Sequence, residues 1–484
     1  MSTAQQTAVP YRLPEAPGRL LARTLSALRF EDLPPEVVRT VKLFTLDTLG
    51  VIGGAAKAPG MQALIGAVTA WEAEGVATLL LDGRKVNPVT AAMANGAAAH
   101  SLDFDDQHDP ARIHAFCVVL PAVLAAVEAA AADASDVAER APVIDGKRML
   151  TALAIGVELF CRLGLACYNS LGKGWHPTTA LGTIASAAAC AYLFGLDEVK
   201  TLDALGLAFT QLSGTTQFIA DGALAKRMGP GFAARSGVLA AHLARHGLTG
   251  PGRFLEGNAG LFKLYERDEV RPEILFDDLG KQWHLLDLSM KPYPCCRCTH
   301  TVIQLALDCR ADGLTSDDIV SGEIALGRVN RQIVGARFDN GHPNPVVHAQ
   351  FNAAYTFAAA LVDGAVSIES FLPERIRADD LAWGSRFTTV ESATIEATDI
   401  APAAVRLTLR DGRVIEKRRE TIKGAPNDPM SENEVIDKFR RCMRYGLGAS
   451  DTALSALEGL IAALDEAPRA QALLDAFGAC RGTA

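Results

Sequence analysis

The feature that most constrains the fold is a succession of alanine- and leucine-rich segments from about Pro17 to about Asp268. Within them, apolar residues recur three and four positions apart, and short glycine or proline breaks separate one segment from the next. The stretch PPEVVRTVKLFTLDTLGVIGG is typical: two prolines open it and Gly53-Gly54 closes it. Because this spacing places apolar side chains on one face of a helix, the pattern predicts an all-helical region.

The pattern changes near Leu285. β-Branched residues alternate with polar ones in SGEIALGRVNRQIV, TTVESATIEAT and AVRLTLRDGRVIEKRRETI, which predicts strands and an Asp-Gly hairpin. HTVIQLALDCRADG and AQFNAAYTFAAALVDGAVS are helical in pattern, and helix resumes after Ser431, which stands at capping-box spacing from Glu434. We therefore predict a mainly α protein with an α+β second domain. Residues 287–424 form the α+β domain, and residues 1–286 and 425–484 form one discontinuous helical domain.

Length and composition exclude several classes of function. The 484 residues suffice for about two or three domains. A net charge of -9 without a lysine- or arginine-rich block argues against a nucleic-acid partner. The first twenty residues lack a basic segment followed by an apolar run, so no export signal is expected. The longest apolar stretch, AFCVVLPAVLAAVEAAAADA, contains Pro121 and Glu128 and favours a buried helix over a membrane span. Ten scattered cysteines suit reduced thiols, so we expect a cytoplasmic protein.

The stretch HSLDFDDQHDPARIH, from His100 to His114, packs four carboxylates and three imidazoles into fifteen residues. Asp105, Asp106 and Asp109 form a D-D-x-x-D pattern that could chelate magnesium for a diphosphate substrate. That chemistry requires a second metal-binding motif, and the nearest candidate, NDPMSENE, places its glutamate one residue short. The alternative is that Asp103, His108 and His114 move protons on an organic acid, and we favour it.

Further polar residues stand in otherwise apolar sequence. His176 precedes a helix in GKGWHPTTALGT, and Lys291 lies in SMKPYPCCRCTH. In DGALAKRMGPGFAARSG, Lys226 and Arg227 are predicted to lie in a loop before a helix that begins near Gly231. Cationic groups near helix N-termini suit anionic ligands, because free backbone N–H groups and the helix dipole add to their charge.

A cysteine cluster raises the possibility of a metal or iron-sulfur site. It comprises Cys295, Cys296 and Cys298, with His300 close behind. Adjacent cysteines fit poorly with the C-x2-C spacing that wraps a metal ion. We therefore do not expect a metal or iron-sulfur site at this cluster.

Five motifs occur in an order that resembles the MmgE/PrpD family: LDTLG, ANGAAAHSLDFDD, GWHPT, DGALAKRMGPGFAARSG and KPYPCCRCTH. The closing KGAPNDPMSENEVIDKF extends the resemblance over nearly the whole chain. The resemblance implies a large helical domain built from both ends of the chain, a smaller α/β lid domain, and commonly a homodimer. It also implies a cofactor-free pocket at the domain junction that binds small di- or tricarboxylates.

The resemblance also implies a set of catalytic residues: Asp103, His114, His176, Lys226 and Lys291. In this scheme the two lysines bind carboxylates and stabilise an enediolate-like state, while His114 or His176 transfers a proton. Asp103 orients that histidine or acts as the base. We expect substrate contacts from Gln107, His108, Arg227 and Cys295. His100 and His108 also suit a structural role, and Asp105, Asp106 and Asp109 suit helix capping or local ion pairs.

The family covers 2-methylcitrate dehydration, cis-aconitate decarboxylation and iminodisuccinate epimerisation. We expect a hydro-lyase that resembles 2-methylcitrate dehydratase. Two departures weaken the decarboxylase alternative: Gln107 replaces a threonine, and RFDNGHPNPVVHAQFN offers His342 and His348 in place of a lid tyrosine. Decarboxylation, epimerisation and a non-catalytic carboxylate-binding role remain alternatives.

Overall fold

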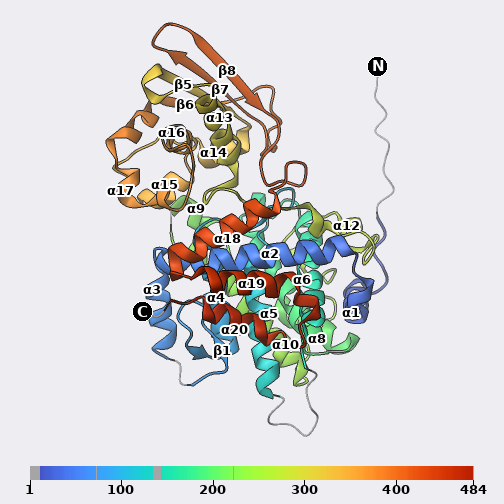
Figure 1. Cartoon of the computed structure of the whole chain (residues 1–484). Coiled ribbons are helices and arrows are strands. Elements are labelled where there is room, and N and C mark those ends of the chain that lie inside the picture. The colour runs from blue at the N-terminus through green and yellow to red at the C-terminus, as the bar shows by residue number, and fades with distance from the viewer. Residues whose placement is uncertain (1–10, 72–73, 134–142, 222, 483–484) are drawn as a thin grey trace, which may run out of the picture.

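The computed structural model describes residues 11–71, 74–133, 143–221 and 223–482 (Figure 1). Within these residues the chain is mainly helical and has one small mixed sheet, as the sequence patterns predict. The first ten residues, which form half of the segment predicted to lack an export signal, lie outside the described part.

In the described chain, twelve helices end at or before Phe276 and three more begin at or after Glu432. They are α1 (Pro17–Ala27), α2 (Pro35–Gly54), α3 (Met61–Thr69), α4 (Pro88–His100), α5 (Phe116–Asp133), α6 (Gly146–Ala166), α7 (Pro177–Leu193), α8 (Glu198–Phe209), α9 (Gln217–Asp221), α10 (Ala225–Arg245), α11 (Leu261–Leu264), α12 (Pro272–Phe276), α18 (Glu432–Leu447), α19 (Asp451–Ala462) and α20 (Gln471–Ala479). One hydrophobic cluster joins side chains from Leu21 to Met290 with others from Val435 to Cys480. The C-terminal helices therefore return to the N-terminal ones, with α18 packed along α2 (Figure 1).

Small residues allow α4 and α10 to pack closely. A Cβ atom added to Gly231 would lie 2.2 Å from the carbonyl oxygen of Met93, and one added to Gly96 would lie 2.9 Å from the Cα of Gly231. No side chain larger than hydrogen fits at this contact without moving the backbone. The close packing brings the C-terminal end of α4 near the first turn of α10.

A second hydrophobic cluster extends from Cys295 to Leu409. Its helices are α13 (His300–Ala311), α14 (Arg328–Val334), α15 (Pro345–Gln350), α16 (Ala353–Asp363) and α17 (Pro373–Ile376). Its sheet has the order β6-β5-β7-β8, formed by β5 (Ile319–Leu326), β6 (Phe387–Glu391), β7 (Ala403–Leu409) and β8 (Val414–Arg419). Strands β5 and β6 are parallel and the other neighbours antiparallel. The predicted hairpin turn is confirmed, with Gly412 at φ 85°.

Two short antiparallel ribbons complete the strands: β1 (Ala77–Thr78) pairs with β2 (Lys85–Val86), and β3 (Gln107–His108) pairs with β4 (Leu288–Ser289). The second ribbon connects the polar cluster to a segment about 180 residues further along the chain.

Three predicted boundaries differ from the structure. The strand predicted over SGEIALGRVNRQIV ends at Leu326, and Arg328–Val334 is helix α14, because Gly327 interrupts the alternation. In TTVESATIEAT only the first residues belong to a strand, β6. Helix α10 begins at Ala225, before Gly231, so Lys226 and Arg227 lie in its first turn. Contacts with α4 and α7 keep this glycine- and proline-containing segment helical despite its low propensity.

Helix α6 is the described helix that is long and apolar enough to cross a bilayer. Inside the protein, 94% of its most apolar window is buried, as in the core helix of a globular domain. The apolar stretch around Pro121 forms α5, whose side chains are also largely buried in the first cluster.

Candidate active site

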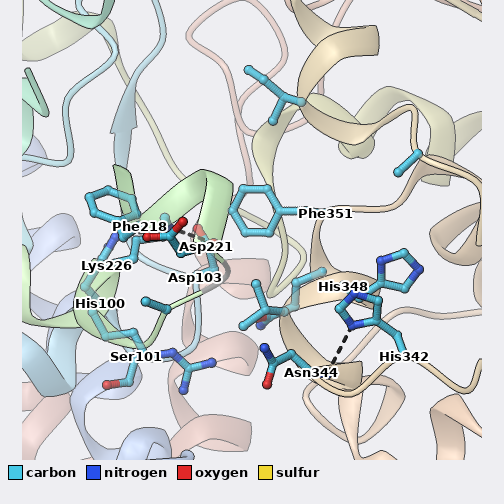
Figure 2. Close-up of a pocket in the computed structure, with 16 residues that line it drawn as sticks. His100, Ser101, Asp103, Phe218, Asp221, Lys226, His342, Asn344, His348 and Phe351 are labelled. Atoms are coloured by element: carbon cyan, nitrogen blue, oxygen red, sulfur yellow. Dashed lines mark hydrogen bonds and ion pairs between the residues drawn. The ribbon is translucent and has the colours of Figure 1, made fainter. Parts of the chain in front are cut away.

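A cavity of about 270 Å³ lies between the two hydrophobic clusters. Residues from α4, α9 and α10 form one wall, and residues from α14, α15 and the loop between them form the other (Figure 2). The lining residues are His100, Ser101, Asp103, Phe218, Asp221, Ala223, Lys226, Arg227, Ile333, Ala336, His342, Asn344, Val347, His348, Gln350 and Phe351. Cavities lined by apolar side chains with a few convergent polar groups are typical binding sites for small molecules.

Asp103 stands at the centre of the first wall, between two lysines. Its Oδ2 accepts a hydrogen bond from Lys226 Nζ at 2.9 Å, and its Oδ1 accepts one from Lys291 Nζ at 2.8 Å. Burial alone would raise the pKa of Asp103, but the two ammonium groups outweigh it and hold the pKa well below its ordinary value. Asp103 therefore stays ionised and pairs with both lysines, so the group of three keeps a net charge of one positive unit.

The backbone at Asp103 is unusual. Its φ of 55° lies in the left-handed region, which non-glycine residues rarely occupy. In this conformation its carbonyl oxygen also accepts from Lys291 Nζ, at 2.9 Å. The next carbonyl, of Phe104, accepts from the buried Lys438 of α18 at 2.7 Å. Lysines from two distant parts of the chain thus hold the strained loop in place.

Gln107 and His108, predicted to bind substrate, lie in strand β3 and do not line the cavity. They pair with Ser289 and Leu288, just before Lys291. The side chain of Gln107 donates to Asp109, and His108 Nδ1 accepts from the backbone N–H of Ala111. The pairing of Gln107 and His108 with Ser289 and Leu288 holds the segment before Lys291 next to the segment after Asp103. Because Gln107 and His108 belong to this ribbon, their side chains do not reach the cavity.

His100 and His114 share Asp105. His100 Nδ1 lies 2.8 Å and His114 Nδ1 3.2 Å from Asp105 Oδ2, and the two rings meet edge to face. On its other side, His100 Nε2 lies 3.2 Å from Lys226 Nζ. Burial, aided by the charge of Lys226, lowers the pKa of His100 to about 4 despite Asp105. The imidazole of His100 is therefore uncharged at neutral pH, whereas Asp105 is ionised.

Asp106 and Asp109 have separate structural partners, as predicted. The Asp106 carboxylate accepts from the backbone N–H groups of Ala115 and Phe116 at the start of α5, at 2.8 and 2.9 Å. Burial and the neighbouring Asp105 raise the pKa of Asp106 to about 7. Asp109 pairs with Arg297 at 3.2 Å. Because the three carboxylates of the D-D-x-x-D pattern point to different partners, they do not form a magnesium site.

Among the described residues, His100, Asp105 and Cys117 have potential ligand atoms within 4.8 Å of one another. His100 Nδ1 already pairs with Asp105, and the ammonium of Lys226 lies against the other ring nitrogen. Burial raises the pKa of Cys117 well above its ordinary value, which opposes the thiolate that a metal ion requires. This group therefore fits a metal ion poorly.

His176 is the N-cap residue of α7, as its position before the helix predicts. Its Nδ1 lies 2.9 Å from Thr179 Oγ1, and its ring meets Phe218 of the cavity wall edge to face. Burial first, then the neighbouring His100 and Lys226, lower the pKa of His176 well below its ordinary value. This imidazole is also uncharged at neutral pH.

Arg227 lines the cavity and is buried. Its Nη1 donates to the carbonyl of Pro59 at 3.2 Å, and no described carboxylate lies within ion-pair distance of its guanidinium. Burial lowers the pKa of Arg227, which shows the cost of a charge without a close counterion. Of the predicted substrate contacts, Arg227 is therefore the side chain best placed to bind a carboxylate.

Cys295 lies outside the cavity lining, in the second hydrophobic cluster, where its Sγ contacts Thr299 Oγ1 at 3.2 Å. Burial raises the pKa of its thiol, so it is an uncharged core residue. In the described part of the chain, the cysteine cluster does not bring three possible ligand atoms together around one ion.

Sequence reasoning assigned a structural role to His100, which lines the cavity. Its place on the last turn of α4, three residues before Asp103, was the available signal, because this spacing brings both side chains to the same end of the helix. His114 and Lys291 lie behind the lining and reach it through His100 and Asp103.

Comparisons with known proteins agree with this architecture. The MmgE/PrpD N-terminal domain matches residues 19–273, and the MmgE/PrpD C-terminal domain matches residues 293–459. A cis-aconitate decarboxylase from Aspergillus terreus is 29% identical over 475 residues, which cover 93% of each chain. The human cis-aconitate decarboxylase is 29% identical over 364 residues, covering 74% of this chain and 73% of the human one. The chain therefore belongs to the MmgE/PrpD family of enzymes.

Proposed function

We propose that the protein is a lyase that decarboxylates a small unsaturated tricarboxylate of the cis-aconitate type. The observation that carries this proposal is that relatives aligned over nearly the full length are named cis-aconitate decarboxylase. This replaces dehydration, which the sequence favoured, as the first candidate. The cavity of about 270 Å³ suits a ligand of this size, and it presents the buried cation Arg227 and the ammonium of Lys226.

The reaction breaks the bond between one carboxylate carbon and the carbon skeleton. Carbon dioxide leaves, the electron pair stays on the skeleton, and the skeleton takes up one proton. Negative charge thus develops beside the carboxylates that remain. Arg227 would hold one of those carboxylates, and Lys226 would face the developing charge from the cavity wall.

The charge states of the site favour Lys226 as the proton donor. His100 and His176 are uncharged at neutral pH, because burial and nearby cations lower both pKa values. Lys226 carries an ammonium at the cavity wall, between Asp103 and His100. In this scheme the lysine gives the proton and His100 Nε2, 3.2 Å away, assists its return. The role differs from the histidine donor inferred from the sequence.

An NMR time course of the metal-depleted protein tests the proposal. The panel contains cis-aconitate, citrate, 2-methylcitrate and iminodisuccinate. We expect cis-aconitate to yield carbon dioxide and a dicarboxylate one carbon shorter. We expect Asp103→Asn and Lys226→Met each to lower kcat/KM by about 100-fold or more, as for loss of an acid–base group. Asp437→Asn, an exposed carboxylate on α18, is the matched control and should retain full activity.

The other outcomes contradict decarboxylation in specific ways. Loss of water from 2-methylcitrate would establish the dehydratase, and loss of stereochemical purity of iminodisuccinate the epimerase. Binding without turnover across the panel would favour a carboxylate-binding protein. Turnover that requires added magnesium or iron would contradict the mechanism based on lysine and aspartate alone.

A further inference from the structure

Three aromatic rings are stacked on the second wall of the cavity. The rings of His342 and His348 are nearly parallel, with an interplanar angle of 10° and centroids 4.4 Å apart. The ring of Phe338 continues the stack behind His348, also at 10° and with centroids 6.0 Å apart. Both histidines line the cavity, whereas Phe338 does not. The stack fixes the planes of both imidazoles.

Backbone hydrogen bonds fix which nitrogen of each ring carries the proton. His342 Nδ1 accepts from the backbone N–H of Asn344, and His348 Nε2 accepts from that of Asp339, both at 3.1 Å. A nitrogen that accepts carries no proton, so in the neutral ring the other nitrogen must be the donor. His342 Nε2–H and His348 Nδ1–H are therefore donors, and no described protein group accepts from either.

The two histidines face the cationic wall across the cavity (Figure 2). The same wall carries the apolar side chains of Ile333, Val347 and Phe351 and the amides of Asn344 and Gln350. The nearest carboxylate in the loop, that of Asp339, already accepts from the backbone N–H of Gly341 at 2.9 Å. Two oriented donors on the wall opposite Lys226 form a second polar part of the same cavity.

We propose that His342 and His348 form a subsite that binds a second carboxylate of the substrate, on the wall of the cavity opposite the wall that carries Lys226 and Arg227. The pair would select di- and tricarboxylates over monocarboxylates, because a ligand with one carboxylate leaves both N–H donors unsatisfied. This inference rests on the proposed function in one respect, namely that the cavity is the substrate site.

Two double variants distinguish the loss of the two N–H donors from a general effect on the fold. Both replace the histidines with one asparagine and one glutamine, in exchanged positions. In His342→Asn with His348→Gln, amide oxygens replace His342 Nδ1 and His348 Nε2, so the backbone bonds remain. No N–H group then stands at the positions of His342 Nε2 and His348 Nδ1, and this variant is called donor-free in that sense. In His342→Gln with His348→Asn, amide nitrogens replace the two donor nitrogens. His246→Gln changes an exposed histidine and is the control.

The measurement is the Kd of two unreactive ligands with the same three-carbon skeleton, propane-1,2,3-tricarboxylate and butanoate, by NMR titration. We expect the donor-free variant to bind the tricarboxylate about tenfold or more weakly, as for lost hydrogen bonds to a charged group. Butanoate binding should change by less than about twofold. The donor-retaining variant should recover most of the tricarboxylate affinity, and the control should match the unaltered protein.

The inference is overturned if both ligands lose affinity equally, if neither changes, or if the donor-retaining variant is as weak as the donor-free one. Failure of the unaltered protein to prefer the tricarboxylate also overturns it. The Tm of each variant is compared with that of the unaltered protein to show that the variant is folded. If a double variant does not fold, the two corresponding single substitutions are measured in its place. Because binding needs no turnover, a protein that fails to decarboxylate can still show this selectivity, which separates the two proposals.

Discussion

At the scale of single residues, the site is governed by burial more than by the ordinary properties of its side chains. An imidazole titrates near neutral pH in water, and the sequence therefore suggested histidine as the proton donor. In the folded protein, burial and cationic neighbours keep His100 and His176 uncharged, and Asp103 stays ionised between two lysines. Lys226, which lines the cavity between Asp103 and His100, is therefore the proton donor in the proposed mechanism.

The low pKa of His100 predicts acid sensitivity. Because its pKa is about 4 in the folded state and about 6.5 when unfolded, its contribution to stability is present above pH 6.5. That contribution is lost as the pH falls towards 4. Thermal unfolding at pH 7.5 and 4.5 should show a smaller loss of Tm for His100→Gln than for the unaltered protein. Equal losses would contradict this assignment, and His246→Gln provides the comparison.

At the scale of elements, the site depends on how closely its supporting helices approach. Helix α4 carries His100, α10 carries Lys226 and Arg227, and the two pack together through Gly96 and Gly231. Helix α18 adds a second support, because Lys438 pairs with Asp47 at 2.6 Å and donates to the carbonyl of Phe104. Neither support touches the cavity, yet both fix the position of groups that do.

Substitution of Gly231 tests the first support. Gly231→Ala places a methyl group against the backbone of Met93, so α4 and α10 must separate. We expect a lower Tm and a loss of kcat/KM, since Lys226 moves away from His100. Gly459→Ala is the matched control, because a Cβ there meets nothing within 4 Å and alanine favours helix. It should keep full activity and an equal or higher Tm.

Removal of Lys438 tests the second support. Lys438→Met should lower Tm, because Asp47 remains buried without its counterion, and should lower kcat more than it raises KM. Adding Asp47→Asn removes that carboxylate, so the double variant should regain part of the Tm. Its kcat should stay low, because the carbonyl of Phe104 still lacks its donor. Recovery of kcat together with Tm would mean that Lys438 acts only on stability.

At the scale of the whole molecule, the cavity exists only where two hydrophobic clusters meet, and each cluster supplies one wall. A bound ligand must therefore stabilise both. In hydrogen exchange with saturating propane-1,2,3-tricarboxylate, we expect slower exchange in residues 223–227 and also in 342–351. Protection confined to the helical wall would contradict a ligand that spans the cavity. Helix α19 contributes no residue to the cavity lining, so slower exchange in α19 would indicate a general effect of the ligand on the fold.

The sequence could predict features that depend on neighbouring residues, but not those that depend on contacts between distant parts of the chain. Local patterns identified α2, the capping box at Ser431 and the hairpin at Gly412, because their signals lie within a few residues. The ribbon between Gln107 and Ser289 could not be predicted, since two-residue strands carry no pattern of their own. The pairing of Asp103 with both lysines likewise depends on contacts across more than 120 positions.

The division of the cavity between two walls bears on how enzymes of this kind diverge. The groups proposed to act on the substrate lie on helices that are locked together by backbone contacts, where a single added methyl group is disruptive. The stacked histidines lie on a loop and short helix of the other wall, and neither of them takes part in the contact between Gly96 and Gly231. A descendant gene could therefore acquire a new substrate by altering the loop while inheriting the older chemistry unchanged.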